Sequence, residues 1–253
     1  MLMIARRRRI VEIVRRQKSV LVRDLARIVA VTEETIRKDL EQLESESKLM
    51  RSHGGAVLPE PPGAEVHFSE RLTRNIREKR AIAAAAVKRV AEGETLMLDA
   101  SSTVLEMARL IPDIRLTVIT NSLQIQLELV SRKNLTLIVL GGILIERSLS
   151  THGPQAERAL EAYHADKAFI SCKGIDPSGA VTESSELMTR VKQAMLQRSD
   201  RRFLLADHSK FGVKSLVTTA RLDDMDEVIT DAGTLGKALK LVQNKSAKVT
   251  VAK

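Results

Sequence analysis

Short polar and glycine-rich motifs that could bind an anion recur through the last two-thirds of the chain. The segment DASST (99–103) places hydroxyl side chains after an expected strand and at the start of an expected helix. A helix start attracts anions, because its first backbone N–H groups have no partner within the helix and the helix dipole is positive there. Serine is also a common helix N-cap, so this motif taken alone favours capping over ligand binding.

Four further segments of this kind follow expected strands: TNS (120–122), LGG (140–142), KGID (173–176) and ADHSK (206–210). In an open α/β sheet, ligands bind outside the carboxyl ends of the strands. Five such strand ends therefore favour a ligand site, and Lys210 could hold a phosphate as a point charge. The expected effector-binding residues from these segments are Asp99, Ser101, Ser102, Thr103, Asn121, Ser122, Gly141, Gly142, Lys173, Gly174, Asp176, Asp207 and Lys210.

A second candidate site lies near the start of the chain, in VTEETIRKDLEQL (31–43). Thr32 suits the N-cap of a helix, and the glutamates that follow fall in the first turn, where the helix dipole favours acids. Spacings of four and three residues place the apolar side chains on one stripe: Ile36, Leu40 and Leu43. Arg37 and Lys38 point away from that stripe, so they are free to face a partner.

The order of elements around this helix favours DNA as the partner. Expected helices at 6–17 and 22–29 precede it, and the alternating segment 48–57, with Gly54-Gly55 at its turn, suits a β-hairpin wing. In a winged helix-turn-helix the third helix enters the major groove, while basic side chains of the wing and first helix hold phosphates. An isolated charged helix would more often be a solvated surface helix, but the assembled order reverses that preference. The expected DNA-binding residues are Arg6, Arg7, Thr32, Glu34, Thr35, Arg37, Lys38, Arg51 and His53.

Composition agrees with a nucleic-acid partner. The 253 residues carry a net charge of +9, and residues 1–57 alone carry 13 Lys+Arg against 8 Asp+Glu. This asymmetry is typical of contact with nucleic acid or an anionic membrane. No apolar run reaches about 18 residues, and the charges of MLMIARRRRI follow its short apolar piece, so we expect neither a membrane span nor a secretory signal. The single cysteine, Cys172, excludes an intrachain disulfide and fits a reducing cytoplasm. The histidines show no metal-ligand spacing, and we expect no metal or cofactor.

The remaining patterns predict how the sites are positioned. Three prolines and a glycine in LPEPPGAE (58–65) predict a linker. Downstream, short apolar segments alternate with helical ones, which predicts a mainly parallel α/β sheet covered on both faces. The expected strands are 96–99, 115–120, 135–142, 165–174, 201–207 and 226–231, and the expected helices are 69–90, 101–111, 121–130 and 185–198. The expected organisation is a winged helix-turn-helix domain over 1–57, a linker over 58–72 and an effector-sensing α/β domain over 73–253.

The segments ETIRKDLEQLE and RSHGGAV resemble the N-terminal signature of the DeoR family of bacterial transcription regulators. Family members usually have a glycine after the third helix, near Ser47 here. The resemblance implies a C-terminal domain similar in fold to ribose-5-phosphate isomerase, which senses phosphorylated sugars. The family's usual first loop is Asp-Ser-Gly-Thr-Thr, and Ala100, Ser101 and Ser102 replace its middle three residues. Together DASST, TNS and SCKGID resemble most the branch of the fucose-operon activator, which implies a deoxy-sugar phosphate.

The isomerase resemblance also implies two acids in an Asp-Gly-Ala-Asp motif and a glutamate before a helix lysine. Here the matching segments are KGID (173–176) and RVK (190–192), so one acid has become Lys173 and the glutamate has become Val191. Because proton abstraction needs a positioned base, we expect a site that binds its ligand without catalysing a reaction. Glu183 and Lys192 also belong to this expected binding site.

These patterns together predict a cytoplasmic DNA-binding transcriptional regulator. It would repress a carbohydrate catabolic operon and respond to a phosphorylated sugar. Two alternatives remain: a sugar-phosphate isomerase with an accessory basic N-terminus, and a nucleic-acid-binding structural protein without an effector. A homodimer or homotetramer is expected, because one winged helix reads few base pairs.

Overall fold

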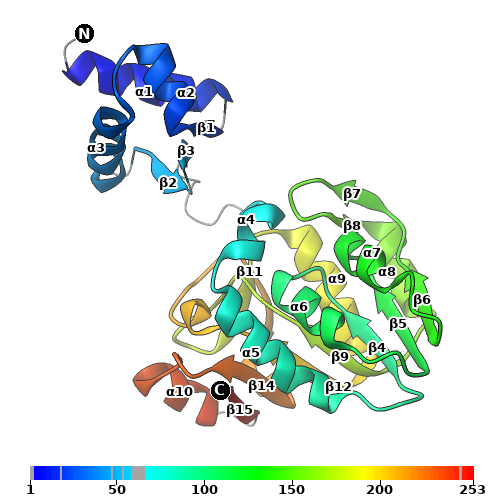
Figure 1. Cartoon of the computed structure of the whole chain (residues 1–253). Helices are drawn as coiled ribbons and strands as arrows, with labels where there is room; N and C mark the ends of the chain where they lie inside the picture. The colour runs from blue at the N-terminus through cyan, green and yellow to red at the C-terminus, as the bar shows by residue number, and fades with distance from the viewer. Residues whose placement is uncertain (1–2, 18, 47, 53, 58–65, 245–246) are drawn as a thin grey trace. The chain divides into compact units, whose positions relative to one another are not determined.

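The computed structural model describes residues 3–17, 19–46, 48–52, 54–57, 66–244 and 247–253. The chain divides into two compact units, Met1–Pro62 and Gly63–Lys253 (Figure 1). The predicted linker at 58–65, His53 of the wing and the turn at Ser47 lie outside the described residues.

The N-terminal unit is a three-helix bundle edged by a small antiparallel sheet of order β1-β3-β2. Its elements are α1 (Met3–Gln17), β1 (Ser19–Leu21), α2 (Val22–Val29), α3 (Glu33–Ser45), β2 (Met50–Ser52) and β3 (Gly55–Val57). The predicted helices and wing are confirmed, and β1 is an additional strand that pairs with β3. Gly54 has a φ of +79°, and a Cβ on Gly55 would overlap the carbonyl of Val20, so both glycines are required by the geometry of the wing.

Helix α3 begins as its sequence predicts. The Thr32 hydroxyl accepts a hydrogen bond from the backbone N–H of Thr35 at 3.3 Å, which is the N-cap contact. The stripe of Ile36, Leu40 and Leu43 is buried in the core of the unit with Ile10 and Leu25. Burial of this stripe leaves the opposite side of α3 exposed.

The C-terminal unit is built on a seven-stranded sheet of order β15-β14-β12-β9-β4-β5-β6, in which all neighbouring strands are parallel. The strands are β4 (Thr95–Leu98), β5 (Leu116–Thr120), β6 (Leu135–Val139), β9 (Ala165–Ile170), β12 (Ser199–Leu205), β14 (Glu227–Asp231) and β15 (Lys248–Ala252). The mainly parallel α/β fold is therefore confirmed, and β15 is an edge strand that the sequence patterns did not predict.

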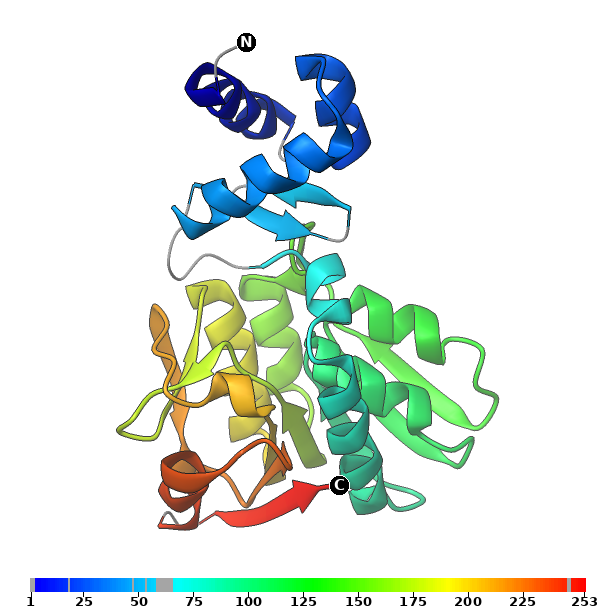
Figure 2. The same ribbon diagram turned by 60° about the vertical axis from the view of Figure 1, so that its left-hand side comes forward.

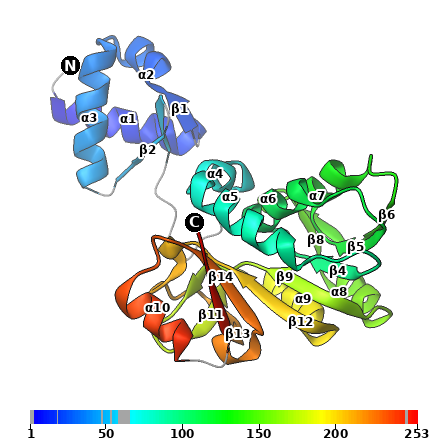
Figure 3. The same cartoon turned by 60° about the horizontal axis from the view of Figure 1, so that its bottom comes forward.

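Helices cover both faces of this sheet (Figure 2 and Figure 3). Side chains alternate along β4, so that Leu96 and Leu98 pack on one face and Met97 on the other. The first face is covered by α5 (Ile76–Ala86), α6 (Ser102–Leu110) and α7 (Leu123–Leu129), and the second by α8 (Pro154–Glu161), α9 (Glu186–Gln197) and α10 (Gly236–Gln243).

Smaller elements surround the carboxyl ends of the strands. They are the hairpin of β7 (Ile143–Ile145) and β8 (Ser150–His152), the antiparallel sheet of β10 (Gly174–Ile175), β11 (Ala180–Glu183) and β13 (Val217–Arg221), and the short helix η2 (His208–Lys210). The short helix η3 (Leu222–Asp224) instead precedes the amino end of β14. The prediction of one strand over 165–174 is therefore wrong: β9 ends at Ile170, and the chain turns before it joins β10.

The prediction of one continuous helix over 69–90 is also wrong. The segment forms α4 (Phe68–Thr73), α5 and η1 (Val87–Arg89), with a break at Asn75, whose φ is +49°. The Asn75 amide donates to Asp207 Oδ1 at 2.9 Å and to Ser209 Oγ at 3.0 Å, and these distant partners hold the left-handed backbone. Helix α4 overlaps the stretch expected to be a linker, 58–72, and its Phe68 is buried in the core of the C-terminal unit.

Candidate effector site and DNA-binding face

A cavity of about 240 Å³ lies in the C-terminal unit, at the carboxyl ends of β4, β9 and β12. These three strands are neighbours in the sheet. After β4 the chain builds the sheet toward β6, and after β9 it builds toward β15, so the cavity lies where the strand order reverses. Ligands of open α/β sheets bind at such a point.

The start of α6 forms one wall. Ser101 is its N-cap: the Ser101 hydroxyl accepts from the Val104 N–H at 3.2 Å, and Asp99 Oδ1 accepts from the Ser101 N–H at 3.1 Å. Ser102 and Thr103 follow in the first turn, and both line the cavity. The first N–H groups of a helix have no intrahelical acceptors, so this wall supplies both backbone donors and hydroxyl groups.

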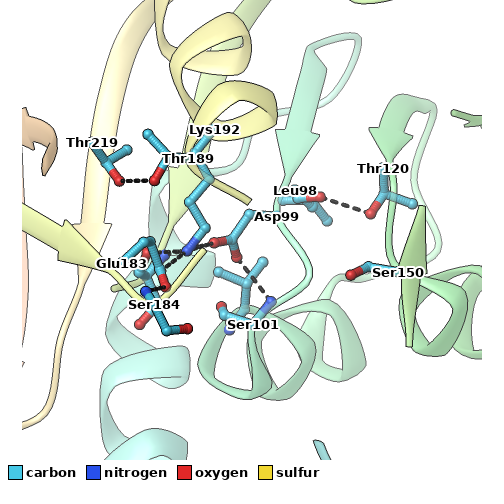
Figure 4. A network of polar contacts seen from close by, with 12 residues as sticks. Leu98, Asp99, Ser101, Thr120, Ser150, Glu183, Ser184, Thr189, Lys192 and Thr219 are labelled. Carbon is cyan, nitrogen blue, oxygen red and sulfur yellow. Dashed lines mark hydrogen bonds and ion pairs between the residues drawn. The ribbon is translucent and has the colours of Figure 1, made fainter. Parts of the chain in front are cut away.

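A buried ion cluster forms the floor next to that wall (Figure 4). The Lys192 ammonium, on α9, lies 3.0 Å from Asp99 Oδ2, contacts Glu183 Oε1 of β11, and donates to the Ser171 carbonyl oxygen at 2.7 Å. Burial would lower the pKa of Lys192, but Asp99 and Glu183 outweigh it and raise the pKa above its ordinary value. The ammonium is therefore balanced inside the protein, and the cluster ties α9, β11 and the end of β4 together.

Cationic side chains dominate the rest of the lining. Among the described residues, six cationic and two anionic side chains line the cavity: Arg71, Arg74, Lys79, Lys173, Lys192 and Lys210, against Glu183 and Asp207. Burial and then repulsion from Lys210 lower the pKa of Lys79 to about 8, and the same two causes lower the pKa of Lys173. The cations thus destabilise one another in the unliganded protein, and an anion in the cavity would relieve that repulsion.

The exposed side of α3 carries the candidate DNA-contacting residues. Arg37 pairs with Glu33 at 2.8 Å, and Lys38 lies 3.3 Å from Glu34 Oε1; the two basic side chains are 61% and 74% exposed. Exposed pairs of this kind contribute about 0.5 kcal/mol or less, so a phosphate can replace the carboxylate at little cost. Arg51 of the wing pairs with Glu44 at 2.8 Å in the same way.

Arg6 and Arg7, also predicted to contact DNA, form ion pairs within the N-terminal unit. Their Nε atoms lie 2.5 and 2.8 Å from the two carboxylate oxygens of Asp39, whose side chain is buried. Burial would raise the pKa of Asp39, but the hydrogen bonds from the two arginines hold it below its ordinary value. The pair of arginines thus holds α1 against α3.

Each of the two units matches a known protein family. A family model described as the DeoR-like helix-turn-helix domain matches residues 6–61, and one described as the DeoR C terminal sensor domain matches residues 74–232. The chain belongs to the DeoR family. It is 48% identical over 250 residues to the HTH-type transcriptional regulator YulB of Bacillus subtilis, with 99% of this chain and 97% of that protein covered. It is 37% identical over 222 residues to the L-fucose operon activator of Haemophilus influenzae, with 88% and 89% covered.

This DeoR-family chain is also 32% identical over 222 residues to the HTH-type transcriptional repressor GlcR of Bacillus subtilis, with 88% and 86% of the two chains covered. Among solved structures, ribose 5-phosphate isomerase A of Methanocaldococcus jannaschii is similar at 17% identity and a TM-score of 0.41, over 54% of this chain and 55% of that one. The chain is accordingly a helix-turn-helix transcriptional regulator with a sensor domain for a small molecule. None of the helices in the described ranges is long and apolar enough to span a membrane.

The residues that the sequence predicted for the effector site divide into two groups in this DeoR-family structure. Eight of them line the cavity: Ser101, Ser102, Thr103, Lys173, Glu183, Lys192, Asp207 and Lys210. Asp99 lies behind the wall and contacts Lys192. The strand-end rule thus brought together residues from three separate segments of the sequence, DASST, KGID and ADHSK.

The other predicted residues do not line the cavity, and each has a local structural role. Asn121 donates to the Thr151 carbonyl oxygen, and Ser122 caps α7 by accepting from the Ile125 N–H. Asp176 accepts from Ser178 and Ala180 and so shapes the turn between β10 and β11. The three glycines act through the backbone: Gly141 follows β6, Gly142 has a φ of +123°, and Gly174 lies against Val213.

Several lining residues were missed from the sequence. Arg71, Arg74, Asn75 and Lys79 come from a stretch that reads as one packing helix. The available signal was the segment RLTRN, in which two arginines three residues apart precede an asparagine that can adopt a left-handed conformation. The other lining residues that were missed are Val66, Ser171, Cys172, Ser184, Met188, Ser209 and Val213. Burial raises the pKa of Cys172 to about 12, so its thiol is a poor nucleophile at neutral pH.

Proposed function

We propose that the N-terminal unit binds operator DNA and that a phosphorylated sugar in the cavity sets the affinity of the protein for that DNA. The observation that carries this proposal is the lining of the cavity, where the described residues supply six cationic side chains against two anionic ones. Such an excess of positive charge around one cavity favours an anionic ligand, and a dianion most of all. Coupling between the two sites is a difference in DNA affinity between the free and the liganded sensor domain.

The phosphate group belongs at the start of α6 in this proposal. Ser102 and Thr103 offer hydroxyl and backbone donors, and Lys210 offers an ammonium from η2, after the end of β12. The sugar hydroxyls would meet Asp207 and Asn75, which can both accept hydrogen bonds. The volume of about 240 Å³ is below the roughly 300–1,000 Å³ of drug-sized sites, which favours a compact metabolite.

The proposed role is repression of a carbohydrate catabolic operon, relieved by the effector. Among the relatives, GlcR is named a repressor and the Haemophilus influenzae protein an activator of the L-fucose operon. A deoxy-sugar phosphate is therefore one effector to test. An isomerase activity is not favoured, because Glu183 contacts Lys192 through one oxygen and the Ser184 N–H through the other, at 3.3 Å. Catalytic proton abstraction would need that carboxylate to reach a substrate carbon.

Self-association is the second part of the proposal. A single winged helix reads few base pairs, and two copies on a symmetric operator supply the missing affinity and specificity. Sedimentation of the full chain at micromolar concentration should give a dimer or tetramer, and a monomer in the presence and absence of DNA would exclude this part.

A thermal-shift screen tests the effector proposal. The probes are pentose, hexose and deoxyhexose monophosphates, each beside its unphosphorylated sugar and inorganic phosphate. At 100 times its Kd, a ligand adds about 2.7 kcal/mol of stability. For a unit of this size that is a rise in Tm of roughly 5–11 °C. The proposal predicts that a phosphorylated sugar stabilises the protein and its unphosphorylated partner does not; equal shifts, or no shift with any phosphate, would contradict it.

Two variants locate the site in that screen. Lys210→Ala removes one hydrogen-bonded charge, which is worth about 1.5–3 kcal/mol, so affinity should fall about ten- to a hundredfold. Ser102→Glu should be more severe, because it places a carboxylate where the phosphate is expected. If both variants bind the stabilising sugar phosphate as the parent does, the anion is held elsewhere.

A further inference from the structure

The first described residues of the C-terminal unit form one wall of the cavity. Arg71 lies on α4, Arg74 and Asn75 lie in the break before α5, and Lys79 lies on α5; all four line the cavity. Helix α4 follows directly on the segment 58–65, which joins the two units along the chain. The other walls, from α6, β11, α9 and η2, connect only to further parts of the C-terminal unit.

Two sets of contacts hold this wall to the rest of the C-terminal unit, and one further contact joins its two helices. The Phe68 N–H donates to the Arg147 carbonyl oxygen at 2.9 Å, and the Phe68 side chain is buried. Lys79 donates from its ammonium to the Arg71 carbonyl oxygen and so bridges α5 to α4. The Asn75 amide donates to Asp207 and Ser209, which both belong to the opposite wall.

The Asn75 contacts are the ones most directly exposed to a ligand. Both acceptors, Asp207 and Ser209, themselves line the cavity and lie beside Lys210. An anion on Lys210, or a sugar hydroxyl on Asp207, therefore acts on the same groups that fix the junction between α4 and α5. Arg74 adds charge to this junction; its guanidinium lies 3.3 Å from Glu70 of α4 and is half-exposed.

We infer that α4 and the Asn75 junction transmit the state of the cavity to the DNA-binding unit, with Asn75 as the positioning residue between them. A bound anion is drawn by Arg71 and Arg74 on one side and by Lys210 and the start of α6 on the other. Binding thus fixes α4, and through the chain that precedes it, the attachment of the DNA-binding unit. This inference rests on the proposed function, because it concerns how the same effector acts.

The test compares Asn75→Gly with the parent. Glycine adopts positive φ without strain, so the bend is kept while both amide hydrogen bonds are removed. Asn134→Gly is the matched control: its amide donates to the Asp113 carbonyl oxygen at 3.2 Å, in an exposed loop that does not line the cavity. The DNA is a duplex selected by the parent from random sequences, and the probes are inorganic phosphate and the sugar monophosphate with the largest thermal shift.

The measured quantity is the ratio of DNA Kd values, by fluorescence anisotropy, with and without each probe. With the sugar monophosphate, the parent and Asn134→Gly should give the same ratio, about fivefold or more from unity. In Asn75→Gly the ratio, measured with the probe at a saturating concentration, should move toward unity by about twofold or more, the effect of removing one or two hydrogen bonds. By linkage, the effect of DNA on the affinity for the sugar monophosphate, measured by titration calorimetry, should shrink by the same factor.

Hydrogen exchange gives a second readout on the parent alone. The amides of Phe68–Thr73 should exchange more slowly when the sugar monophosphate is bound. An unchanged ratio in Asn75→Gly, or unchanged exchange in α4, would overturn the inference. If no phosphate probe changes the DNA affinity of the parent, the proposed function itself is overturned. Failure of the inference and failure of the proposed function are therefore distinguishable.

Discussion

Replacing Lys192 with methionine should strongly destabilise the sensor domain. The side chain is 6% exposed, and its ammonium serves two buried carboxylates and one carbonyl oxygen. Methionine keeps most of the stem but removes the charge. Asp99 would keep hydrogen bonds from the Ser101 and Ser171 N–H groups, at 3.1 and 3.0 Å. Glu183 would keep one from Ser184 at 3.3 Å, so its carboxylate is the less well compensated.

The size of the effect follows from this geometry. Removing one partner of a buried ion pair costs about 3–5 kcal/mol, because the remaining charge is left uncompensated. For a unit of this size, each kcal/mol lowers Tm by about 2–4 °C, so the expected fall is roughly 6–20 °C. Adding Glu183→Gln should recover part of the loss, since it removes one of the unpaired charges.

Differential scanning calorimetry of the full chain measures this fall. Lys133→Met, at an exposed position, is the control and should change the free energy of unfolding by about 0.5 kcal/mol or less. A fall in Tm of less than about 2 °C for Lys192→Met would refute the interpretation of this cluster as a charge-balanced floor of the cavity.

Three further predictions concern other charged groups. Changing Arg37 and Lys38 to alanine should weaken DNA binding and leave Tm unchanged. The slope of the logarithm of the DNA-binding constant against the logarithm of the salt concentration should become less steep by about 0.9 for each phosphate that is no longer neutralised. Anisotropy titrations identical to those of the parent would exclude α3 as the DNA-binding face. Asp39→Asn should lower the free energy of unfolding of the N-terminal unit by about 1–3 kcal/mol in a denaturant titration followed by circular dichroism, and a variant as stable as the parent would contradict this. The pKa of Lys79 is lowered to about 8 in the folded protein, so the unfolded chain holds this proton more tightly. The contribution of Lys79 to the free energy of unfolding should therefore rise with pH between about 8 and 10.5. Affinity for a sugar phosphate should fall over the same range as the ammonium loses its proton, and Lys79→Met should flatten that pH profile in calorimetry.

Local rules account for much of what the sequence could predict. The cap at Thr32, the stripe of α3 and the wing glycines depend on neighbours within a few residues, and all appear where they were expected. Short apolar segments that alternate with helical ones were enough to predict the parallel strands. The rule that ligands bind at strand ends then brought Ser102, Lys173 and Lys210 around one cavity, although they are far apart in the sequence.

The features that the sequence did not predict depend on contacts between distant segments of the chain. The break at Asn75 is held by Asp207, 132 residues away, and no local pattern contains that partner. No local pattern shows that Asp39 of α3 pairs with Arg6 and Arg7, more than thirty residues earlier in the chain. The turn at Asp176 looked like a strand-end ligand motif because a polar turn and a polar binding loop have the same composition.

The most direct test of the central claim is the DNA affinity of the full chain during a titration with a sugar phosphate. We predict that one pentose, hexose or deoxyhexose monophosphate changes the Kd for a selected duplex by about fivefold or more, and that its unphosphorylated sugar does not. We also predict that Ser102→Glu removes this response. If no sugar phosphate changes the Kd of the parent, or if Ser102→Glu responds as the parent does, the cavity at the start of α6 is not the effector site.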